Sequence, residues 1–519
     1  MRPLYRKILI GIAAVVLLIV GVLAYVASRL DGIAHDYALN ALQQKYKNDV
    51  ELGPVKISLL NGVSASAQNL KFHQRGRTGV PPLIEIAEAR AKMTWLSLLR
   101  QSKTISSLEL KGLRINIPPK VEGQPRFDTG PPSGRPAPDF LIRRVSADGT
   151  ILRIIPKEPG KDPLEWNIRK LKLQSAGPKQ AMRFDAVLTN AKPPGDINSK
   201  GHFGPWNADD PGQTPLDGDY TFKNADLSVF KGIAGILSSQ GQYTGVLEKI
   251  DAKGTTLTPD FRLGADGNPL PLKADFHAII DGTSGDTYLQ PVRAMLANTP
   301  IECSGGVYGK AGVKGKTIDL DMKVSGGRID DMLRLAIKTK HPPLVGGITL
   351  KAKLVIPPGD VDVVRKLRLK GDFAMNRVSF TDNTIQDKLE SLSTRARGKP
   401  DAPARDVTSH FDGKFDIANG TITMDRLIFA MPGADVKLAG SYGMRSEKID
   451  FAGHLLMDAR ISETVGGYKS WLLKPIDPFF AKDGRGAVIP IKITGTREDP
   501  QYGLNFGGGN GKKEQKNKK

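Results

Sequence analysis

Cysteine is nearly absent from this chain of 519 residues. Cys303 is the only one, which excludes an intramolecular disulfide framework and any cluster of thiolate metal ligands. A single free cysteine usually behaves as a small apolar side chain. We therefore expect Cys303 to lie among apolar residues and to have no catalytic role.

The spacings that mark catalytic and metal sites are also missing. The seven histidines never fall at the i, i+4 spacing of paired metal ligands. Gly507–Lys512 is glycine-rich but lacks the spacing of a phosphate loop, and Asp319-Leu-Asp321 lacks the remaining ligands of a calcium loop. Gly282-Thr-Ser-Gly285 is not a nucleophile elbow. The sequence predicts no enzyme activity, no metal and no cofactor.

Acidic residues are in deficit, with 54 Asp and Glu against 75 Lys and Arg and a formal net charge of +21. The first seven residues account for +3, and the tail Lys512–Lys519 accounts for +4. The remaining +14 is spread over about 500 residues. Such a dilute excess is not the basic stripe that nucleic-acid recognition requires, so we expect no nucleic-acid partner.

Long hydrophobic runs are absent, with one exception. Ile8–Ser28 carries no charge over 21 residues, about the length that crosses ~30 Å of hydrocarbon. Three basic residues within 1–7 precede it, so the positive-inside rule predicts a cytoplasmic N-terminus and export of the chain after Arg29. The alternative is a cleaved signal peptide with a cleavage site at 22–24 or 26–28. We favour a retained single-pass anchor, because the apolar core of a signal peptide is only about 7–15 residues long.

Beyond the anchor, apolar residues first recur at helical and then at strand spacing. Asp31–Asn48 is predicted to be a helix. From Ala87 to Trp95 apolar and polar residues alternate, which is the period of a half-buried strand. A second alternation, Leu108–Ile117, slips in phase at Gly112, which predicts a β-bulge. Trp95–Leu99 is predicted to form a short helical turn between them.

Seven prolines within 118–139 predict a linker, and the chain beyond it alternates between strands and short turns. The clearest predicted strands are Ile168–Leu173, Phe184–Leu188, Ile318–Val324, Ile348–Ile356, Leu367–Phe373, Phe411–Ile417 and Val436–Tyr442. The predicted short helices are Leu227–Ser238, Ile329–Lys338, Ile385–Leu392 and Ser462–Leu473. Asp330 and Asp331 are expected to cap the second of these helices, and Asn419-Gly420 predicts a hairpin. A Gly-x-aromatic-Gly motif at 201–204, 306–309 and 440–443 indicates a sheet extended by repetition.

The apolar faces of such strands have two uses, which the same period-2 pattern allows. They close against each other as packed sheets, or they line a groove that is open to lipid acyl chains. The side chains predicted to line this face in the early sheet are Ala89, Ala91, Met93, Trp95, Leu108, Leu110, Leu113 and Ile115. In a groove, Leu110→Asp blocks lipid binding and leaves the protein folded, whereas in a closed core it unfolds the protein.

Three stretches occur in a recognisable order. The first is the apolar run followed by Val50–Leu60 and Val63–Leu70, and the second extends from Ile84 to Ile117. The third runs from Leu472 to Phe506 and contains Val488–Arg497, with the segment PIKITGT. Together they resemble the AsmA-like family of envelope proteins, which is related to bridge-like lipid-transfer proteins with chorein-type N-termini.

The resemblance implies a mainly β fold with an N-terminal transmembrane helix and a few short helices, its antiparallel sheet elongated and curved into a β-taco. The expected organisation is a cytoplasmic stub at 1–7, the anchor at 8–28, a chorein-like region at 29–117, the linker at 118–139, a periplasmic β-rich region at 140–506 and a disordered basic tail at 507–519. The tail either keeps the end of the chain soluble or contacts anionic headgroups.

The implied location is the inner membrane, with most of the chain in the periplasm. The implied function is to move phospholipid toward the outer membrane and so maintain its lipid balance. The implied partners are the inner membrane, phospholipid acyl chains and outer-membrane components. The alternative is an envelope assembly scaffold, or chaperone-like factor, whose sheets are packed shut and which binds outer-membrane proteins.

Overall fold

The structure is a computed structural model that describes most of the chain between residues 50 and 504. The described residues are 50–58, 62–73, 79–99, 103–117, 140–155, 163–177, 180–205, 211–230, 232–263, 268–282, 284–310, 313, 315–337, 341–359, 361–403, 407–481 and 484–504. The predicted anchor, the predicted helix at 31–48, the linker and the basic tail lie outside them. In the described part of the chain, no helix is long and apolar enough to cross a bilayer.

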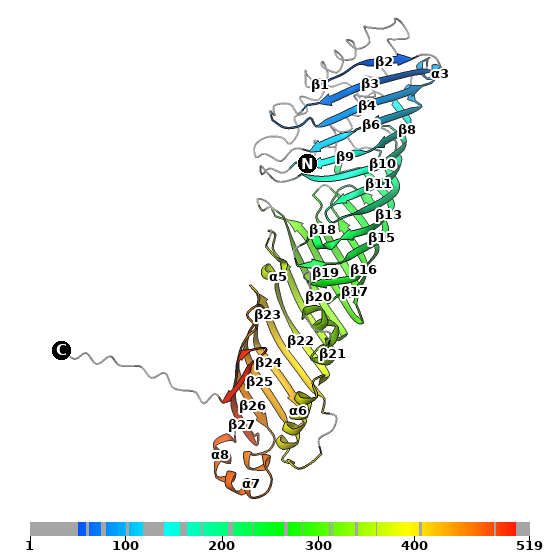
Figure 1. Ribbon diagram of the computed structural model, residues 1–519. Helices are drawn as coiled ribbons and strands as arrows, with labels where there is room; N and C mark the ends of the chain where they lie inside the picture. Colours follow the sequence, from blue (N-terminus) through cyan, green and yellow to red (C-terminus); the bar gives the residue numbers. More distant parts are fainter. Residues whose placement is uncertain are drawn as a thin grey trace, which may run out of the picture. The chain divides into compact units, whose positions relative to one another are not determined.

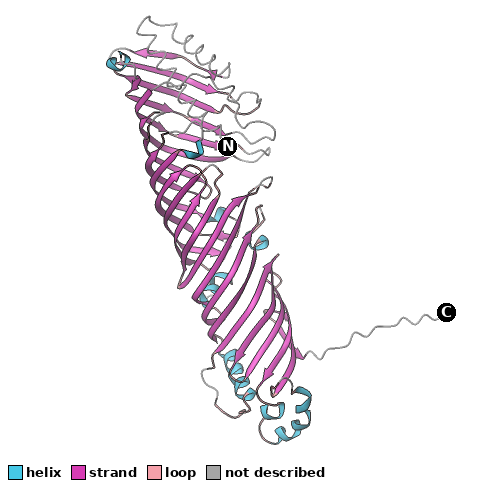
Figure 2. Ribbon diagram, turned by 180° about the vertical axis from the view of Figure 1, so that it is seen from behind, coloured by secondary structure: helices cyan, strands magenta, loops and turns pink. Residues whose placement is uncertain are grey.

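The described chain is mainly β, as predicted, and divides into two compact units. The first unit comprises residues 1–230, 235–259 and 274–290. The second comprises residues 231–234, 260–273 and 291–519. Figure 1 labels the elements, and Figure 2 shows the strands of each unit as a layer with few helices.

In the first unit the sheet runs from β1 to β16. Its strands are β1 Val50–Glu51, β2 Val55–Ser58, β3 Val63–Phe72, β4 Ile84–Met93, β5 Lys103–Ile105, β6 Ser107–Lys111, β7 Arg114–Ile117, β8 Phe140–Asp148, β9 Thr150–Ile154, β10 Leu164–Ala176, β11 Met182–Ala191, β12 Pro194–Phe203, β13 Pro215–Asp226, β15 Ile236–Val246 and most of β16 Lys249–Leu263. From β10 to β13 each strand pairs antiparallel with the next, and β13 then pairs with β15 and β15 with β16.

One part of this sheet departs from the antiparallel expectation. β8 runs parallel to β5 and β6, and β9 runs parallel to β7. A parallel neighbour requires a long connection, and the proline-rich residues 118–139 supply its length.

The predicted bulge at Gly112 is instead a break between β6 and β7, both of which pair with β4. Gly112 has a φ of +61°, and a Cβ at this position would lie 2.8 Å from the Cβ of Ala87. Only glycine fits both the left-handed backbone and this close approach.

The second unit is an antiparallel meander in which each strand from β19 to β28 pairs with the next. Its strands are β14 Ile233–Ala234, β19 Thr299–Gly309, β20 Lys316–Arg328, β21 Leu344–Ile356, β22 Arg368–Phe380, β23 Ser409–Ala418, β24 Thr421–Met431, β25 Ala434–Gly443, β26 Lys448–Met457, β27 Ala487–Thr496 and β28 Pro500–Leu504. β17 Leu270–Ile280 and β18 Thr287–Leu296 contribute residues to both units. The predicted hairpin at Asn419-Gly420 joins β23 to β24, with φ values of +52° and +74° that suit a type I′ turn.

The helices are short and lie mostly in the second unit. They are α3 Trp95–Leu99, η1 Pro211–Gln213, η2 Leu227–Val229, α4 Ile329–Ala336, α5 Val363–Lys366, α6 Asn383–Ala396, η3 Ile461–Thr464, α7 Tyr468–Leu473, η4 Lys474–Ile476 and α8 Asp477–Phe480. The helices predicted at 329–338 and 385–392 correspond to α4 and α6, and 462–473 is divided between η3 and α7.

The helix predicted over Leu227–Ser238 is wrong. Only η2 forms there, and β15 begins at Ile236. Gly232 and Gly235, with φ values of +101° and +132°, interrupt any helix, and the following residues alternate between exposed and half-buried along the ladder with β13.

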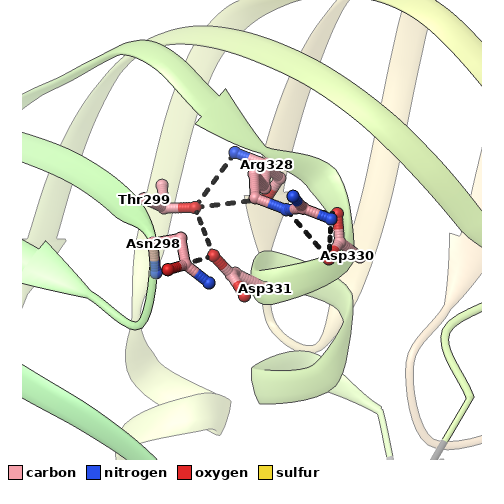
Figure 3. A network of polar contacts seen from close by, with 5 residues as sticks. All are labelled: Asn298, Thr299, Arg328, Asp330 and Asp331. Carbon is pink, nitrogen blue, oxygen red and sulfur yellow. Dashed lines mark hydrogen bonds and ion pairs between the residues drawn. The ribbon is translucent and has the colours of Figure 1, made fainter.

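Helix α4 is fastened to the sheet by a buried carboxylate (Figure 3). Asp331 accepts hydrogen bonds from the Asn298 backbone N–H and from Thr299 Oγ1, each at 3.0 Å. Asp330 points elsewhere and pairs with Arg328 at 3.1 Å. The two carboxylates therefore diverge as expected, but the prediction that they cap their own helix is wrong, since Asp331 bonds the turn before β19 instead.

Candidate functional site

The apolar face of the sheet is the candidate site, and the residues predicted to line it lie mostly together in the first unit. Ala89, Ala91, Met93, Leu108, Leu110 and Leu113 are buried in one cluster, and Ile115 packs against it. Across the β4–β6 ladder Ala89 lies opposite Leu110 and Ala91 opposite Leu108. Trp95 does not join them, because it lies on α3 with 48% of its surface exposed.

This early cluster is fully covered, unlike the strands that follow. Side chains such as Leu70, Ile105 and Ile142 complete a core with almost no exposed surface. A carboxylate in place of Leu110, which is 4% exposed, would be placed in that core. Leu110→Asp therefore probes folding here, and the accessible part of the apolar face begins further along the chain.

From β12 to β15 the apolar face is half-buried instead of buried. Ile197 lies opposite Phe222, and Phe203 lies opposite Leu216, with each of these four side chains partly accessible. A sheet packed against a second sheet buries its inward side chains almost completely. In the described part of the first unit, these strands therefore present their apolar residues to a space that no second sheet fills.

Aromatic rings on this face extend across to glycines on the neighbouring strand. Tyr243 lies opposite Gly218, where a Cβ would be 2.7 Å from the tyrosine oxygen. Phe373 lies opposite Gly413 in the second unit, where a Cβ would be 3.0 Å from the ring. Because each ring occupies the space of a missing side chain, it covers its own sheet instead of projecting toward another layer.

Two tyrosine hydroxyls form a narrow polar band within the half-buried strands. Tyr243 lies 2.8 Å from Ser199 Oγ, and Tyr220 lies 2.9 Å from Ser239 Oγ. Each serine donates its own hydrogen to a backbone carbonyl, so each tyrosine is the donor in its pair. Burial raises the pKa of both Tyr220 and Tyr243, which keeps the phenols neutral.

In the second unit a continuous line of apolar residues crosses seven strands, each directly opposite the next. We call it the apolar row: Leu320, Leu354, Leu369, Ile417, Ile422, Tyr442 and Ile449. Every member is half-buried. Buried clusters occur beside it, and partly buried side chains of α4 (Met332 and Leu333) and of α6 (Leu389 and Leu392) pack against them. The row itself is not covered by any described element to that extent.

The residues one position along the same strands form a polar row on the opposite face. Its members are Asp321, Lys353, Lys370, Asp416, Thr423, Ser441 and Asp450. Lys353 pairs with Asp319 at 3.0 Å and Lys370 with Asp416 at 3.9 Å. Exposed ion pairs of this kind contribute little stability, and the lysines that form them face water.

Two histidines outside the apolar face contact carboxylates. His202 contacts Asp217 at 3.1 Å and His277 contacts Asp251 at 2.9 Å. Cys303 is half-buried opposite Met322 on the apolar face, and burial raises the pKa of its thiol. Within the described residues, no three His, Cys, Asp or Glu side chains converge to hold a metal ion.

Sequence reasoning missed both the ring-on-glycine pairs and the apolar row. A usable signal for the ring-on-glycine pairs was the Gly-x-aromatic spacing at 218–220, 241–243, 371–373 and 413–415, which places glycine and an aromatic residue on one strand face. No family model, no curated protein and no solved structure matches this chain.

Proposed function

We propose that the protein binds phospholipid acyl chains along its half-buried apolar faces and transfers phospholipid across the cell envelope. The observation that carries the proposal is the apolar row, because it is unbroken over seven strands and accessible on each of them. A closed core of this extent would be buried throughout.

The length of the apolar row suits a lipid tail. Neighbouring strands are about 4.8 Å apart, so seven strands span about 29 Å. The hydrocarbon core of a bilayer, which holds two opposed tails, is about 30 Å thick. The row is therefore long enough to bury more than one acyl chain placed across the strands.

Transfer along such a face requires no catalytic group. A methylene left in water costs about 0.8 kcal/mol, so a tail of about 14 methylenes would meet a barrier of about 11 kcal/mol in open solvent. An acyl chain that moves from a bilayer onto the apolar face of a sheet is shielded from water before and after the move. The polar row then faces water while the tail remains on the other side.

We further propose, from the sequence, that Ile8–Ser28 anchors the chain in the inner membrane and that the described units lie in the periplasm. Phospholipid would then move from the anchored end toward the outer membrane. The composition of the run and the basic residues before it support this placement.

The test is the lipid content of the purified full chain, measured by native mass spectrometry and by extraction. Leu354→Asp places a charge in the apolar row, whereas Lys351→Asp places the same charge on the exposed opposite face. We expect the first variant to lose bound phospholipid by about tenfold and the second to retain it. An unmodified chain that carries no lipid, or equal lipid in both variants, would contradict the proposal.

The scaffold alternative has one observation in its favour. β28 pairs with β27 alone among the described strands, and its Tyr502 and Leu504 side chains are strongly exposed. An edge strand of this kind can accept a strand from another protein. Absence of lipid together with loss of a protein partner in a Tyr502→Pro variant would favour this alternative.

A further inference from the structure

The helical segment Ile461–Phe480, which we call the C-terminal cap, combines a rigid base with an apolar outer surface. It contains η3, α7, η4 and α8, and Figure 1 shows α7 and α8 beside the ends of β26 and β27. Ile461 and Phe480 pack against the buried cluster of the sheet. Buried Asp477 accepts hydrogen bonds from the Ser462 N–H at 2.9 Å and from its hydroxyl at 2.7 Å. The apolar contacts hold the cap on the sheet, and the hydrogen bonds join its first helix to its last.

Four large apolar side chains of the cap are exposed. The exposed fractions are 72% for Trp471, 57% for Leu472, 38% for Ile476 and 77% for Phe479. Large apolar residues that gather at one place on a surface mark an interaction site. All four fall within nine residues of the chain.

The charges beside these side chains are positive. Lys469 and Lys474 are exposed, and Asp477 is buried on Ser462. The other acidic residue of the cap, Glu463, is exposed near its start, where it accepts a hydrogen bond from the Arg460 N–H at 2.8 Å. The accessible charge of residues 465–481, which carry the four apolar side chains, is therefore cationic. Tryptophan, phenylalanine and leucine flanked by lysine form the composition that inserts shallowly into an anionic membrane surface, since the lysines reach the headgroups while the rings enter the acyl boundary.

The geometry of the cap disfavours a helix-binding protein groove. α7 has six residues and α8 has four, and Pro475 and Pro478 separate their turns. Groove-bound helices present anchors at i, i+3 and i+7 on one continuous helix, which these turns do not provide. A bilayer surface makes no such demand on the path of the backbone.

We infer that the C-terminal cap docks on an anionic bilayer, with Trp471 and Phe479 inserted and Lys469 and Lys474 on the headgroups. This contact is separate from acyl-chain binding on the apolar row, and neither requires the other. It gives the second unit its own membrane contact, independent of any N-terminal anchor.

The test measures whether the full chain captures vesicles. The chain is first reconstituted into nanodiscs of zwitterionic phosphatidylcholine. Labelled vesicles containing about one third phosphatidylglycerol are added, and co-flotation is measured. We expect Trp471→Ser with Phe479→Ser to reduce capture by at least about tenfold. Tyr288→Ser, which removes an aromatic residue that is 49% exposed on β18, should leave capture unchanged.

Three further arms separate this mechanism from others. Lys469→Glu with Lys474→Glu should weaken capture without touching the apolar residues, and circular dichroism checks the fold of each variant. Brominated phospholipid should quench tryptophan fluorescence in the unmodified chain and quench it less in a Trp471→Ser variant. Deletion of 512–519 should reduce capture less than the double serine variant does. The inference would be overturned if the unmodified chain captured no vesicles, or if capture were lost only when the tail is deleted. The amount of phospholipid bound to the chain should be the same in every variant.

Discussion

At the scale of single residues, the side chains of this protein are sorted by alternation along each strand. Leu354 and Lys353 are neighbours in sequence, yet one lies half-buried in the apolar row and the other is exposed on the opposite face. Two contacts add constraints that alternation does not provide: the hydrogen bonds of Asp331 hold α4 against the sheet, and the Tyr243 ring occupies the space beside Gly218. Each of these two can be tested by a paired substitution.

Gly218→Ala should destabilise the first unit because the new methyl group has no space. Its Cβ would lie 2.6 Å from the Lys200 carbonyl oxygen and 2.7 Å from the Tyr243 hydroxyl. We expect a loss of about 1–3 kcal/mol in the free energy of unfolding, measured by urea denaturation. Gly503→Ala is the control, since nothing lies within 4 Å of its Cβ. Equal free energies of unfolding for the two variants would show that Tyr243 does not occupy the space beside Gly218.

Asp331→Ala should destabilise the second unit much more than Asp330→Ala. The first substitution leaves the Asn298 N–H and the fully buried Thr299 hydroxyl without their carboxylate, at a cost of about 2–4 kcal/mol. The second removes only the ion pair with the exposed Arg328 guanidinium, which water screens, so its effect should be much smaller. Urea midpoints of the two variants measure the difference, and a larger effect at Asp330 would refute the role assigned to Asp331.

At the scale of secondary-structure elements, short helices cover parts of the sheet of the second unit, whereas the strands that carry the apolar row are only half-buried. α4 and α6 contribute side chains to buried clusters, and the cap rests on Ile461 and Phe480. The elements that carry the proposed contacts with lipid, by contrast, are strands with half-buried faces. Mutations in the C-terminal cap can therefore change membrane docking without changing the stability of the sheet.

Asp477→Ala should loosen the C-terminal cap without unfolding the sheet. Both hydrogen bonds from Ser462 end on this carboxylate, so the cap loses its internal tie. We expect amide hydrogen exchange to accelerate by at least about tenfold across 461–480 and to remain slow in β25 and β26. Lys474→Ala, which removes an exposed side chain, is the control. Uniform acceleration across the second unit would mean that the cap is not a separate local structure.

The elements also show how far sequence reasoning reaches. Period-2 alternation was enough to predict strands at Ile318–Val324 and Ile348–Ile356, and the Asn419-Gly420 turn was enough to predict a hairpin. The helix at Leu227–Ser238 failed because pairing with β13 outweighed a local helical spacing. Register could not be predicted, since bulges such as the one between Met375 and Val378 shift which residues oppose each other.

At the scale of the whole molecule, the two units share one design, an amphipathic sheet with an accessible apolar face. The first unit shows it at Ile197 and Phe222, and the second shows it along the apolar row. The early strands were expected to carry the site, but their side chains are the most deeply buried of the first unit. Alternation along a strand predicts which side chains share a face but not what covers that face. The sequence therefore could not predict that the early strands would be buried and the later ones accessible.

The measurement that tests the central claim most directly is a photo-crosslinking scan of the full chain in membranes that contain radiolabelled phospholipid. A crosslinking residue is placed at Ile197, Leu354 or Ile422 on the apolar face, and at the adjacent exposed positions Asn198, Lys353 or Thr423 as matched controls. We predict phospholipid adducts at the first three positions and none at the second three. Adducts at neither set, or equally at both, would contradict the account.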